Sequence, residues 1–401
     1  FGYTMIVAET AIGRMTRKSP VGAFKSFGKK KWLSFGGWIN AVIPVLIVPY
    51  YSVIGGWVIK YLVEYFRGNA KLLAEDGYFT DFISNGVSTE LCFVAFCAFT
   101  LIIIFAGVQN GIERVSKIMM PILIVLSVII AVYSVTRPGA LAGVKYFLVP
   151  NVKNFSWMTV VSAMGQMFYS LSIAMGILIT FGSYMKKDTA IEDSTRNVEV
   201  FDTGIAIMAG LMIIPAVFAF SGGDPDTLQA GPSLMFITIP KVFQNMGFGT
   251  VIGIVFFLLV LFAAVTSSIA LTESAVSTFE DELGWGRKKA TVLVGVIMLV
   301  LGSLSSLGYG PLAGIKIIGM QFLDLFDFLT NSVMMPIAAL LTSLLVSRVV
   351  GIDKIEEEII HGESAFRRKK VFVVMIKYLC PVFAIIILLS SVANALGWIK
   401  M

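Results

Sequence analysis

The stretch VIGIVFFLLVLFAAVTSSIALTESAVST, residues 251–278, is long and apolar enough to cross a lipid bilayer as one helix. It nevertheless contains three adjacent hydroxyl side chains, Thr266, Ser267 and Ser268, with the carboxylate of Glu273 one turn further on. Polar groups are costly in hydrocarbon unless they find a partner. The segment therefore predicts a membrane span and poses the question of which groups its polar residues contact.

Composition extends this prediction to the whole chain. Of the 401 residues, 57% are hydrophobic and 14% are charged, whereas soluble domains carry about 25% charged residues. Apolar runs of about 20 residues recur, and their pattern lacks the period-two alternation of a β-barrel. We predict an all-α polytopic membrane protein whose residues 1–401 form a single transmembrane domain.

Several kinds of catalytic or nucleic-acid site are disfavoured. The cysteines (Cys92, Cys97 and Cys380) lie in apolar runs and are expected to fill space. His361 lies alone in a charged loop. Because no phosphate-binding loop, metal cluster or nucleophile–base pair is recognisable, we expect neither an enzyme nor an organic cofactor.

Ten apolar segments are expected to be helical, at residues 1–13, 36–66, 89–107, 117–136, 157–182, 198–220, 250–278, 290–307, 324–348 and 371–397. The first is too short to span, and the chain starts at Phe1 without an initiator methionine. We therefore expect that the chain begins inside a helix and that at least one span precedes it.

The basic residues are unevenly divided between the loops on the two sides of these segments. One set of loops contains 21 of the 31 Lys and Arg residues, and the opposite set contains eight. The positive-inside rule assigns the first set to the cytoplasm. The net charge of +6 thus reports membrane topology and does not indicate nucleic-acid binding.

Residues 221–249 form one of the predicted external loops. Within them, Pro232 and Pro240 bracket an apolar stretch, Leu234 to Ile239, that is too short to span the membrane. We expect a hairpin packed against the external mouth, because irregular backbone near membrane depth must be covered by protein.

Polar residues interrupt two further segments. The sequence GQMFYSLSIAMG, Gly165–Gly176, fits a discontinuous helix that binds ions and charged groups, but close helix packing by small residues explains it equally well. Asp202 lies about one turn inside the predicted segment 198–220, which makes it either a functional carboxylate or a residue near the interface.

Two alternatives also remain open for Thr266 and Ser267. Their hydroxyls can bond the carbonyl one turn earlier, or they can bind sodium together with the carbonyl of Ala263. In segment 36–66, Tyr50 and Tyr51 directly follow Pro49 and are expected to line a cavity.

In this order and spacing, the segments resemble the neurotransmitter:sodium symporter family, which has the LeuT fold, an inverted-repeat helical bundle. The resemblance covers essentially the whole chain, from the family's second span to its eleventh. It is carried by ETAIGR (Glu9–Arg14), PYYSVIGGW (Pro49–Trp57), GIERVSKIMMP (Gly111–Pro121), GQMFYSLSIAMG, GPSLMFITIPKVF (Gly231–Phe243), FAAVTSSIA and FEDEL (Phe279–Leu283).

The resemblance implies two sodium sites, each completed by groups of the first span. The first would use the carbonyl of Ala263 and the oxygens of Thr266 and Ser267, and the second would use Ser170 and Asp202. Ala206 stands where some members have a chloride-binding serine or a glutamate, so transport is expected to be independent of chloride.

An implied amino-acid site would involve Tyr51, which bonds the substrate carboxylate, and the residues Ile47, Tyr169, Ser170, Ser172, Met175 and Leu271. Tyr169, Ala174 and Met175 differ from the commonest family pattern. A flexible methionine adapts to different apolar shapes, which favours a large hydrophobic or aromatic amino acid.

The implied gates come from the same comparison. Asp327 would be the acidic partner of the external gate, with Gln166 beside it. Tyr184 and Asp281 would belong to the cytoplasmic gate, and Glu9 would bond the unwound backbone of the first span.

The resulting prediction is a sodium-coupled amino-acid symporter of the plasma membrane that works by alternating access, with no obligate protein partner. One alternative is a membrane protein or sensor that binds amino acids without transport, but the sodium ligands argue against it. Another is a non-functional fragment, because without a first span both sodium sites would be incomplete.

Overall fold

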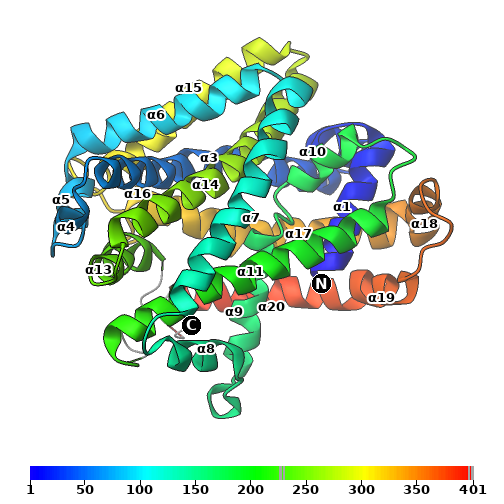
Figure 1. Ribbon diagram of the computed structural model, residues 1–401. Helices are drawn as coiled ribbons and strands as arrows, with labels where there is room; N and C mark the ends of the chain where they lie inside the picture. Colours follow the sequence, from blue (N-terminus) through cyan, green and yellow to red (C-terminus); the bar gives the residue numbers. More distant parts are fainter. Residues whose placement is uncertain (225–227, 229–230, 396–397, 399–401) are drawn as a thin grey trace.

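The computed structural model describes residues 1–224, 228, 231–395 and 398, and this part of the chain is helical apart from loops and one isolated β-bridge between Ile317 and Met320 (Figure 1). Its elements are α1 (Gly2–Thr16), α2 (Pro20–Lys25), α3 (Lys31–Phe66), α4 (Ala70–Leu73), α5 (Tyr78–Ser84), α6 (Gly86–Phe105), η1 (Val108–Glu113), α7 (Arg114–Val135), α8 (Ala140–Leu148), η2 (Val152–Asn154), α9 (Trp157–Ser170), α10 (Ile177–Tyr184), α11 (Ile191–Ser221), α12 (Gly231–Ser233), η4 (Leu234–Thr238), α13 (Ile239–Gln244), α14 (Gly249–Leu283), α15 (Arg287–Leu307), α16 (Phe322–Asp327), η5 (Phe328–Met334), α17 (Met335–Leu344), η6 (Leu345–Val350), α18 (Ile352–Ile360), α19 (Lys369–Val374), η7 (Met375–Leu379) and α20 (Cys380–Ala395).

Eight helical segments of the described residues are long and apolar enough to cross a membrane. They coincide with eight of the ten predicted segments, and the segment expected at 36–66 begins earlier, at Lys31. The two others are the short α1 and residues 157–182, which form α9 and α10 with a break between them. Residues 396 and 397 of the last predicted segment lie outside the described part.

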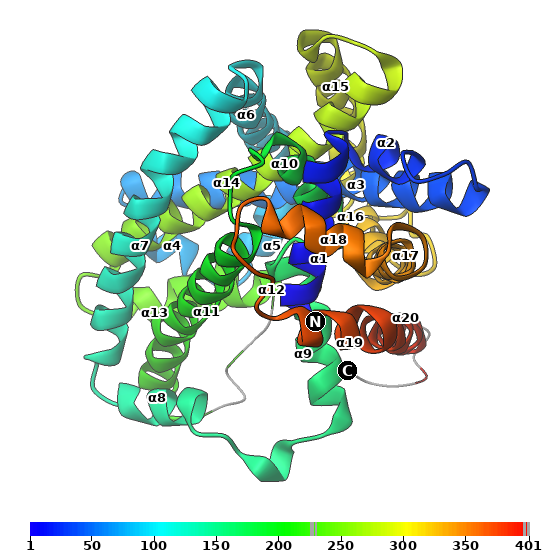
Figure 2. The ribbon, with the colours of Figure 1, turned by 90° about the vertical axis from the view of Figure 1, so that its right-hand side faces the viewer.

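Helix α14 lies between several spans, packing against α3, α6, α7 and α15 (Figure 2).

Small residues permit close approach of helices α3 and α6. A Cβ atom added to Gly55 of α3 would lie 2.5 Å from the ring of Phe96 in α6, and one added to Gly56 would lie 2.7 Å from the backbone of Phe93. The α3–α6 interface therefore depends on these two glycines.

Figure 1 places α4, α5 and α13 at one end of the molecule and α18 at the other. The sequence assigns the first group to the external side and α18 to the cytoplasmic side. The fold thus separates the two sets of loops as a membrane topology requires.

The predicted external hairpin is largely helical where it is described, since α12, η4 and α13 follow one another. Residues 225–227 and 229–230 of this loop lie outside the described part. Phe236 is buried among the aromatic rings of α3, α5 and α14, and its carbonyl accepts a hydrogen bond of 2.7 Å from Tyr61. Lys241 pairs with Asp76 and lowers the pKa of that carboxyl group.

Replacing Phe236 by alanine is expected to loosen this external segment and to destabilise the protein by about 3–5 kcal/mol, because a buried ring is lost and a cavity remains. Phe248, which is 83% exposed, provides the matched control. Thermal unfolding in detergent should show a lower Tm for Phe236→Ala and an unchanged one for Phe248→Ala. Equal Tm values for the two variants would contradict the packing described here.

Candidate functional site

The break between α9 and α10 covers residues 171–176. Ser172 and Ala174 have φ angles of 54° and 58°, and Gly176 has a φ of 73°. The left-handed conformation is unfavourable for residues with a side chain, so surrounding contacts must hold it. The structure therefore contains the discontinuous helix, which was one of the two alternatives for this stretch.

Glu9 of α1 is one of those contacts. Its side chain is fully buried, and its Oε1 accepts a hydrogen bond of 2.8 Å from the backbone N–H of Ala174. Oε2 is buried without a hydrogen-bond partner in the described part of the chain. The contact predicted between Glu9 and first-span backbone stays a prediction, whereas its bond to the break between α9 and α10 was not anticipated.

A cavity of about 180 Å³ lies beside the break, bounded by α3, α9, α10 and α14. It is lined by Tyr51, Tyr169, Ser170, Ser172, Met175, Ile177, Ser267, Ala270 and Leu271. Six of the seven residues expected at the substrate site are among them. The seventh, Ile47, is fully buried on α3.

Two lining residues, Ile177 and Ala270, were missed from the sequence. Ala270 follows Ser267 by three residues on α14, so helical periodicity places it on the same face. Ile177 is the first residue of α10, and its position depends on where the break ends.

The three hydroxyls of α14 have three different surroundings. Thr266 donates to the carbonyl oxygens of Phe262 and Ala263, at 3.1 and 3.0 Å. Ser267 lines the same cavity as Tyr51, and Ser268 lies 3.1 Å from the hydroxyl of Thr100 on α6. Thr266 therefore bonds its own helix, and the same contact brings its oxygen beside the Ala263 carbonyl.

Asp202 lies next to the break. Its Oδ1 accepts a hydrogen bond of 2.7 Å from the hydroxyl of Ser170, the last residue of α9. Helix α11 begins at Ile191, so Asp202 is about 16 Å along the helix. The predicted start at residue 198 was too late, and Asp202 lies well inside the helix, away from its end.

Neither the pair Thr266 and Ser267 nor the pair Ser170 and Asp202 resembles a transition-metal site. The described residues contain no group of three or more His, Cys, Asp or Glu side chains that could hold a metal ion. Hydroxyl, carbonyl and carboxylate oxygens suit a hard cation such as sodium. Ser267 and Ser170 both line the cavity, so a cation at either pair would lie close to its contents.

Glu273, the carboxylate of the opening stretch, is fully buried and paired. Its oxygens accept hydrogen bonds from Arg287 of α15 at 3.0 and 2.5 Å, and from the hydroxyl of Tyr184 at 2.8 Å. Asp281 accepts instead from the backbone N–H of Ser19 at 2.5 Å. Tyr184 and Asp281, both expected at the cytoplasmic gate, therefore have separate partners.

At the opposite end, Asp327 accepts hydrogen bonds from Tyr50 at 3.2 Å and from Asn331 at 2.5 Å. Gln166, expected beside this gate, is exposed on α9. Both hydrogen-bond donors to Asp327 are neutral groups.

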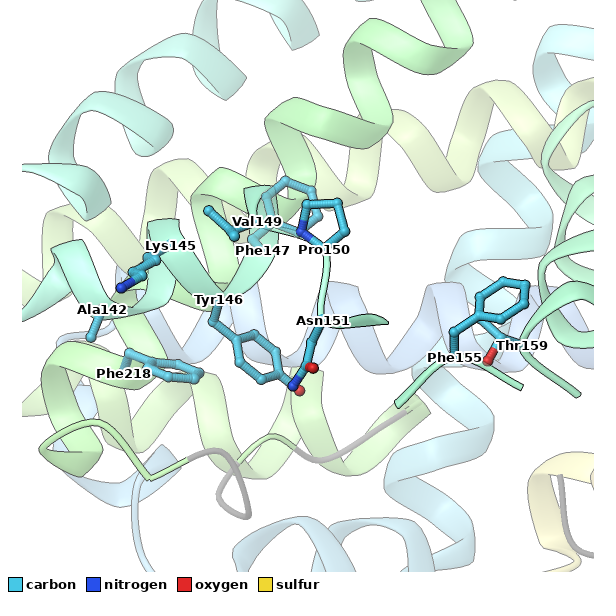
Figure 3. A pocket seen from close by; sticks show the side chains of 10 residues that line it. All are labelled: Ala142, Lys145, Tyr146, Phe147, Val149, Pro150, Asn151, Phe155, Thr159 and Phe218. Carbon is cyan, nitrogen blue, oxygen red and sulfur yellow. The ribbon is translucent and has the colours of Figure 1, made fainter. Parts of the chain in front are cut away.

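The described residues also form a larger cavity of about 780 Å³ between α8, the following loop and the end of α11 (Figure 3). It contains none of the predicted site residues. Its side chains include Lys145, Tyr146, Phe155 and Phe218, and it is open to the surroundings. Six of the residues expected at the substrate site line the smaller cavity instead.

Gly176→Ala is expected to prevent folding or to lower the thermal stability strongly. The new Cβ would lie 2.7 Å from the Asn40 carbonyl oxygen, and the φ of 73° disfavours alanine. Gly165→Ala is the control, because nothing lies within 4 Å of its added Cβ and helical alanine is favoured by about 1 kcal/mol. Yield and thermal stability in detergent check both, and a well-folded Gly176→Ala protein would contradict the geometry of the break.

Known proteins resemble this chain over most of its length. The Sodium:neurotransmitter symporter family model matches residues 63–398. The sodium-dependent transporter YhdH of Bacillus subtilis is 33% identical over 395 residues, which cover 98% of this chain and 87% of that protein. A sodium-dependent transporter of Haemophilus influenzae is 30% identical over 407 residues, with 97% and 87% covered.

Among solved structures, the crystal structure of MhsT in complex with L-phenylalanine matches with a TM-score of 0.85 and 33% identity. The match covers 97% of this chain and 88% of that chain. The family match, the relatives and the shared fold agree with one another. The chain belongs to the sodium:neurotransmitter symporter family.

Proposed function

We propose that this protein is a sodium-coupled amino-acid symporter of the plasma membrane and that its substrate is a hydrophobic or aromatic amino acid. The observation that carries this proposal is that the small cavity is lined by polar residues and by apolar residues. Tyr51, Ser170, Ser172 and Ser267 provide polar groups, whereas Met175, Ile177, Ala270 and Leu271 provide apolar ones. A zwitterionic head group needs the first set, and an apolar side chain is bound by the second.

The solved relative supports the substrate class, since MhsT was crystallised with L-phenylalanine. In the proposal, Tyr51 binds the substrate carboxylate, because a phenol can donate to it. Met175 adapts to the shape of the apolar side chain. Ile47 supports this wall from the buried face of α3.

Two sodium ions would couple to this substrate. One binds the Ala263 carbonyl, Thr266 and Ser267, and the other binds Ser170 and Asp202. A cation shifts a conformational equilibrium only if it binds one state more tightly. Because each set includes a residue of the cavity wall, an ion and a substrate can each favour the state that holds the other.

Alternating access requires that the cavity be closed at one end at a time. Asp327 with Tyr50 would close the external end. Tyr184 with Glu273, and Asp281 of α14 with Ser19 at the start of α2, would close the cytoplasmic end. No covalent chemistry is needed, which agrees with a transporter that is not an enzyme.

Asp202→Asn is expected to raise the sodium concentration for half-maximal uptake about tenfold or more, because a bond to a charged group contributes about 1.5–3 kcal/mol. Asp193→Asn removes the same charge from an exposed position of the same helix and should leave it unchanged. The measurement is uptake of radiolabelled phenylalanine by the full-length protein in proteoliposomes. Unchanged sodium dependence in Asp202→Asn would remove this residue from the coupling.

The same vesicles distinguish transport from binding alone. Sodium-driven accumulation is expected for a symporter, and substrate binding without accumulation would favour the sensor. Uptake should be inhibited by hydrophobic and aromatic amino acids and should be the same in chloride and in gluconate, because Ala206 offers no side-chain oxygen to an anion site. A requirement for chloride would overturn the proposed independence.

A further inference from the structure

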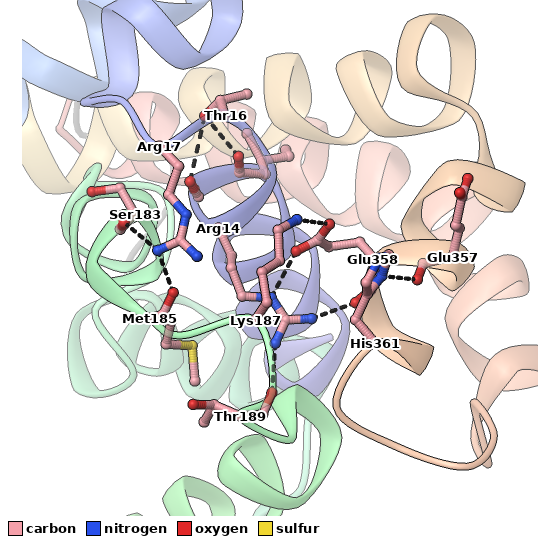
Figure 4. Close-up of polar contacts among 12 residues, drawn as sticks. Arg14, Thr16, Arg17, Ser183, Met185, Lys187, Thr189, Glu357, Glu358 and His361 are labelled. Atoms are coloured by element: carbon pink, nitrogen blue, oxygen red, sulfur yellow. Dashed lines mark hydrogen bonds and ion pairs between the residues drawn. The ribbon is translucent and has the colours of Figure 1, made fainter.

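Arg14, at the end of α1, is a buried charge that neither the cavity nor the proposed gates use. Its side chain is fully buried, and its Nε donates to Glu358 Oε1 at 2.7 Å. Its two terminal nitrogens donate to the backbone carbonyls of Glu358 and Thr189 (Figure 4). A desolvated charge is tolerated only when paired and hydrogen-bonded, so this contact holds α1 firmly to its neighbours.

The partner of Arg14 belongs to α18. Glu358 is 4% exposed, and its second oxygen accepts from Lys187 at 2.6 Å. Lys187 and Thr189 lie in the connection between α10 and α11. Glu358 thereby joins α18 to two elements at once.

Helices α1 and α10 form one unit at this end. Arg17 donates to the carbonyls of Ser183, at 3.1 Å, and Met185 (Figure 4). The two helices also pack directly, so closely that a Cβ added to Gly13 would meet the Ile179 carbonyl oxygen. The Arg14–Glu358 contact, which binds α18 to α1, therefore also fixes α18 relative to α10.

The connection after α18 is attached to the same unit. Glu192 of α11 accepts hydrogen bonds from the backbone N–H groups of Arg367 and Arg368, at 2.8 and 3.0 Å, and from the hydroxyl of Tyr3 at 2.9 Å. Glu363 accepts in turn from the N–H of Glu192 at 2.5 Å. Residues 352–368 are thus bound along their length to α1 and to the start of α11.

The other end of α18 leads to the external gate. Gly351, with φ 88° and ψ 148°, joins it to the helical segment Phe322–Val350. That segment carries Asp327 near its far end, about 35 Å away at 1.5 Å per residue. The break residue Ala174 is held by Glu9, one turn before Arg14 on α1. Helix α1 therefore links the Arg14–Glu358 pair to the pocket, and the segment Phe322–Val350 links it to the gate.

We propose that Arg14 and Glu358 are positioning residues that make the cytoplasmic end of Phe322–Val350 follow α1 and α10 during transport. The pair stays formed in both orientations and conveys movement of the helices around the pocket to Asp327. This inference rests on the proposed symport, because it assigns the pair a part in alternating access. It predicts that breaking the pair slows turnover without weakening substrate binding.

Glu358→Gln tests the pair, with Glu357→Gln as the control on the same helix, since the Glu357 side chain is exposed. The full-length protein is assayed for sodium-dependent equilibrium binding and for initial uptake of radiolabelled phenylalanine. Glu358→Gln should bind within about twofold of the unmodified protein while its uptake rate falls about tenfold. Glu357→Gln should match the unmodified protein in both measurements.

A second readout reports on the external end directly. Cys92, Cys97 and Cys380 are replaced by alanine, and one new thiol is introduced by Asp324→Cys. This thiol is labelled by a water-soluble reagent with and without sodium. Sodium should change the labelling rate in the parent protein. It should no longer do so when Glu358→Gln is added, although sodium-dependent binding is retained.

Arg14→Lys is the second variant, because it keeps the charge but cannot reach all three acceptors. It should show the same loss of uptake with retained binding. Absence of sodium-driven uptake by the unmodified protein would overturn the proposed function itself. If that protein transports, the inference alone is overturned when both variants transport like Glu357→Gln, or when binding is lost together with uptake.

Discussion

Backbone polar groups at membrane depth must find partners inside the protein, and the six residues 171–176 impose this requirement at the centre of the bundle. They give up regular helical bonds and adopt left-handed conformations at Ser172, Ala174 and Gly176. Glu9 provides a buried acceptor for the backbone N–H of Ala174, and the backbone of Asn40 in α3 packs closely against Gly176. The cavity exists because these neighbours hold the chain in a conformation it would not adopt alone.

Five carboxylates in or beside the spans fall into two groups according to their partners. Glu273 and Glu358 are neutralised by arginines from other elements, so their charges serve to hold helices together. Asp202, Asp327 and Glu9 are bonded instead by hydroxyl, amide or backbone N–H groups. For Asp202 and Asp327, neutral donors agree with the proposed cation site and with a gate that has a cationic partner.

Helix α14 explains why a run of hydroxyls is useful in an apolar span. Successive residues of an α-helix point about 100° apart, so Thr266, Ser267 and Ser268 reach three different surroundings. One bonds its own helix, one faces the cavity and one contacts α6. The same run therefore contributes to packing and to the cavity. The bond of Thr266 to its own helix is observed, and sodium binding by Thr266 and Ser267 stays a prediction.

Sequence determined the spans, because apolar length is a local property, and through the family resemblance it also predicted residues of the site. It predicted eight of the membrane-spanning segments and six residues that line the cavity. Only the tertiary structure decided that residues 157–182 are broken, that Asp202 is deep in its helix, and that Arg14 meets Glu358, 344 residues away. The partner of a buried charge depends on how distant elements pack against one another, and local sequence patterns contain no information about that packing.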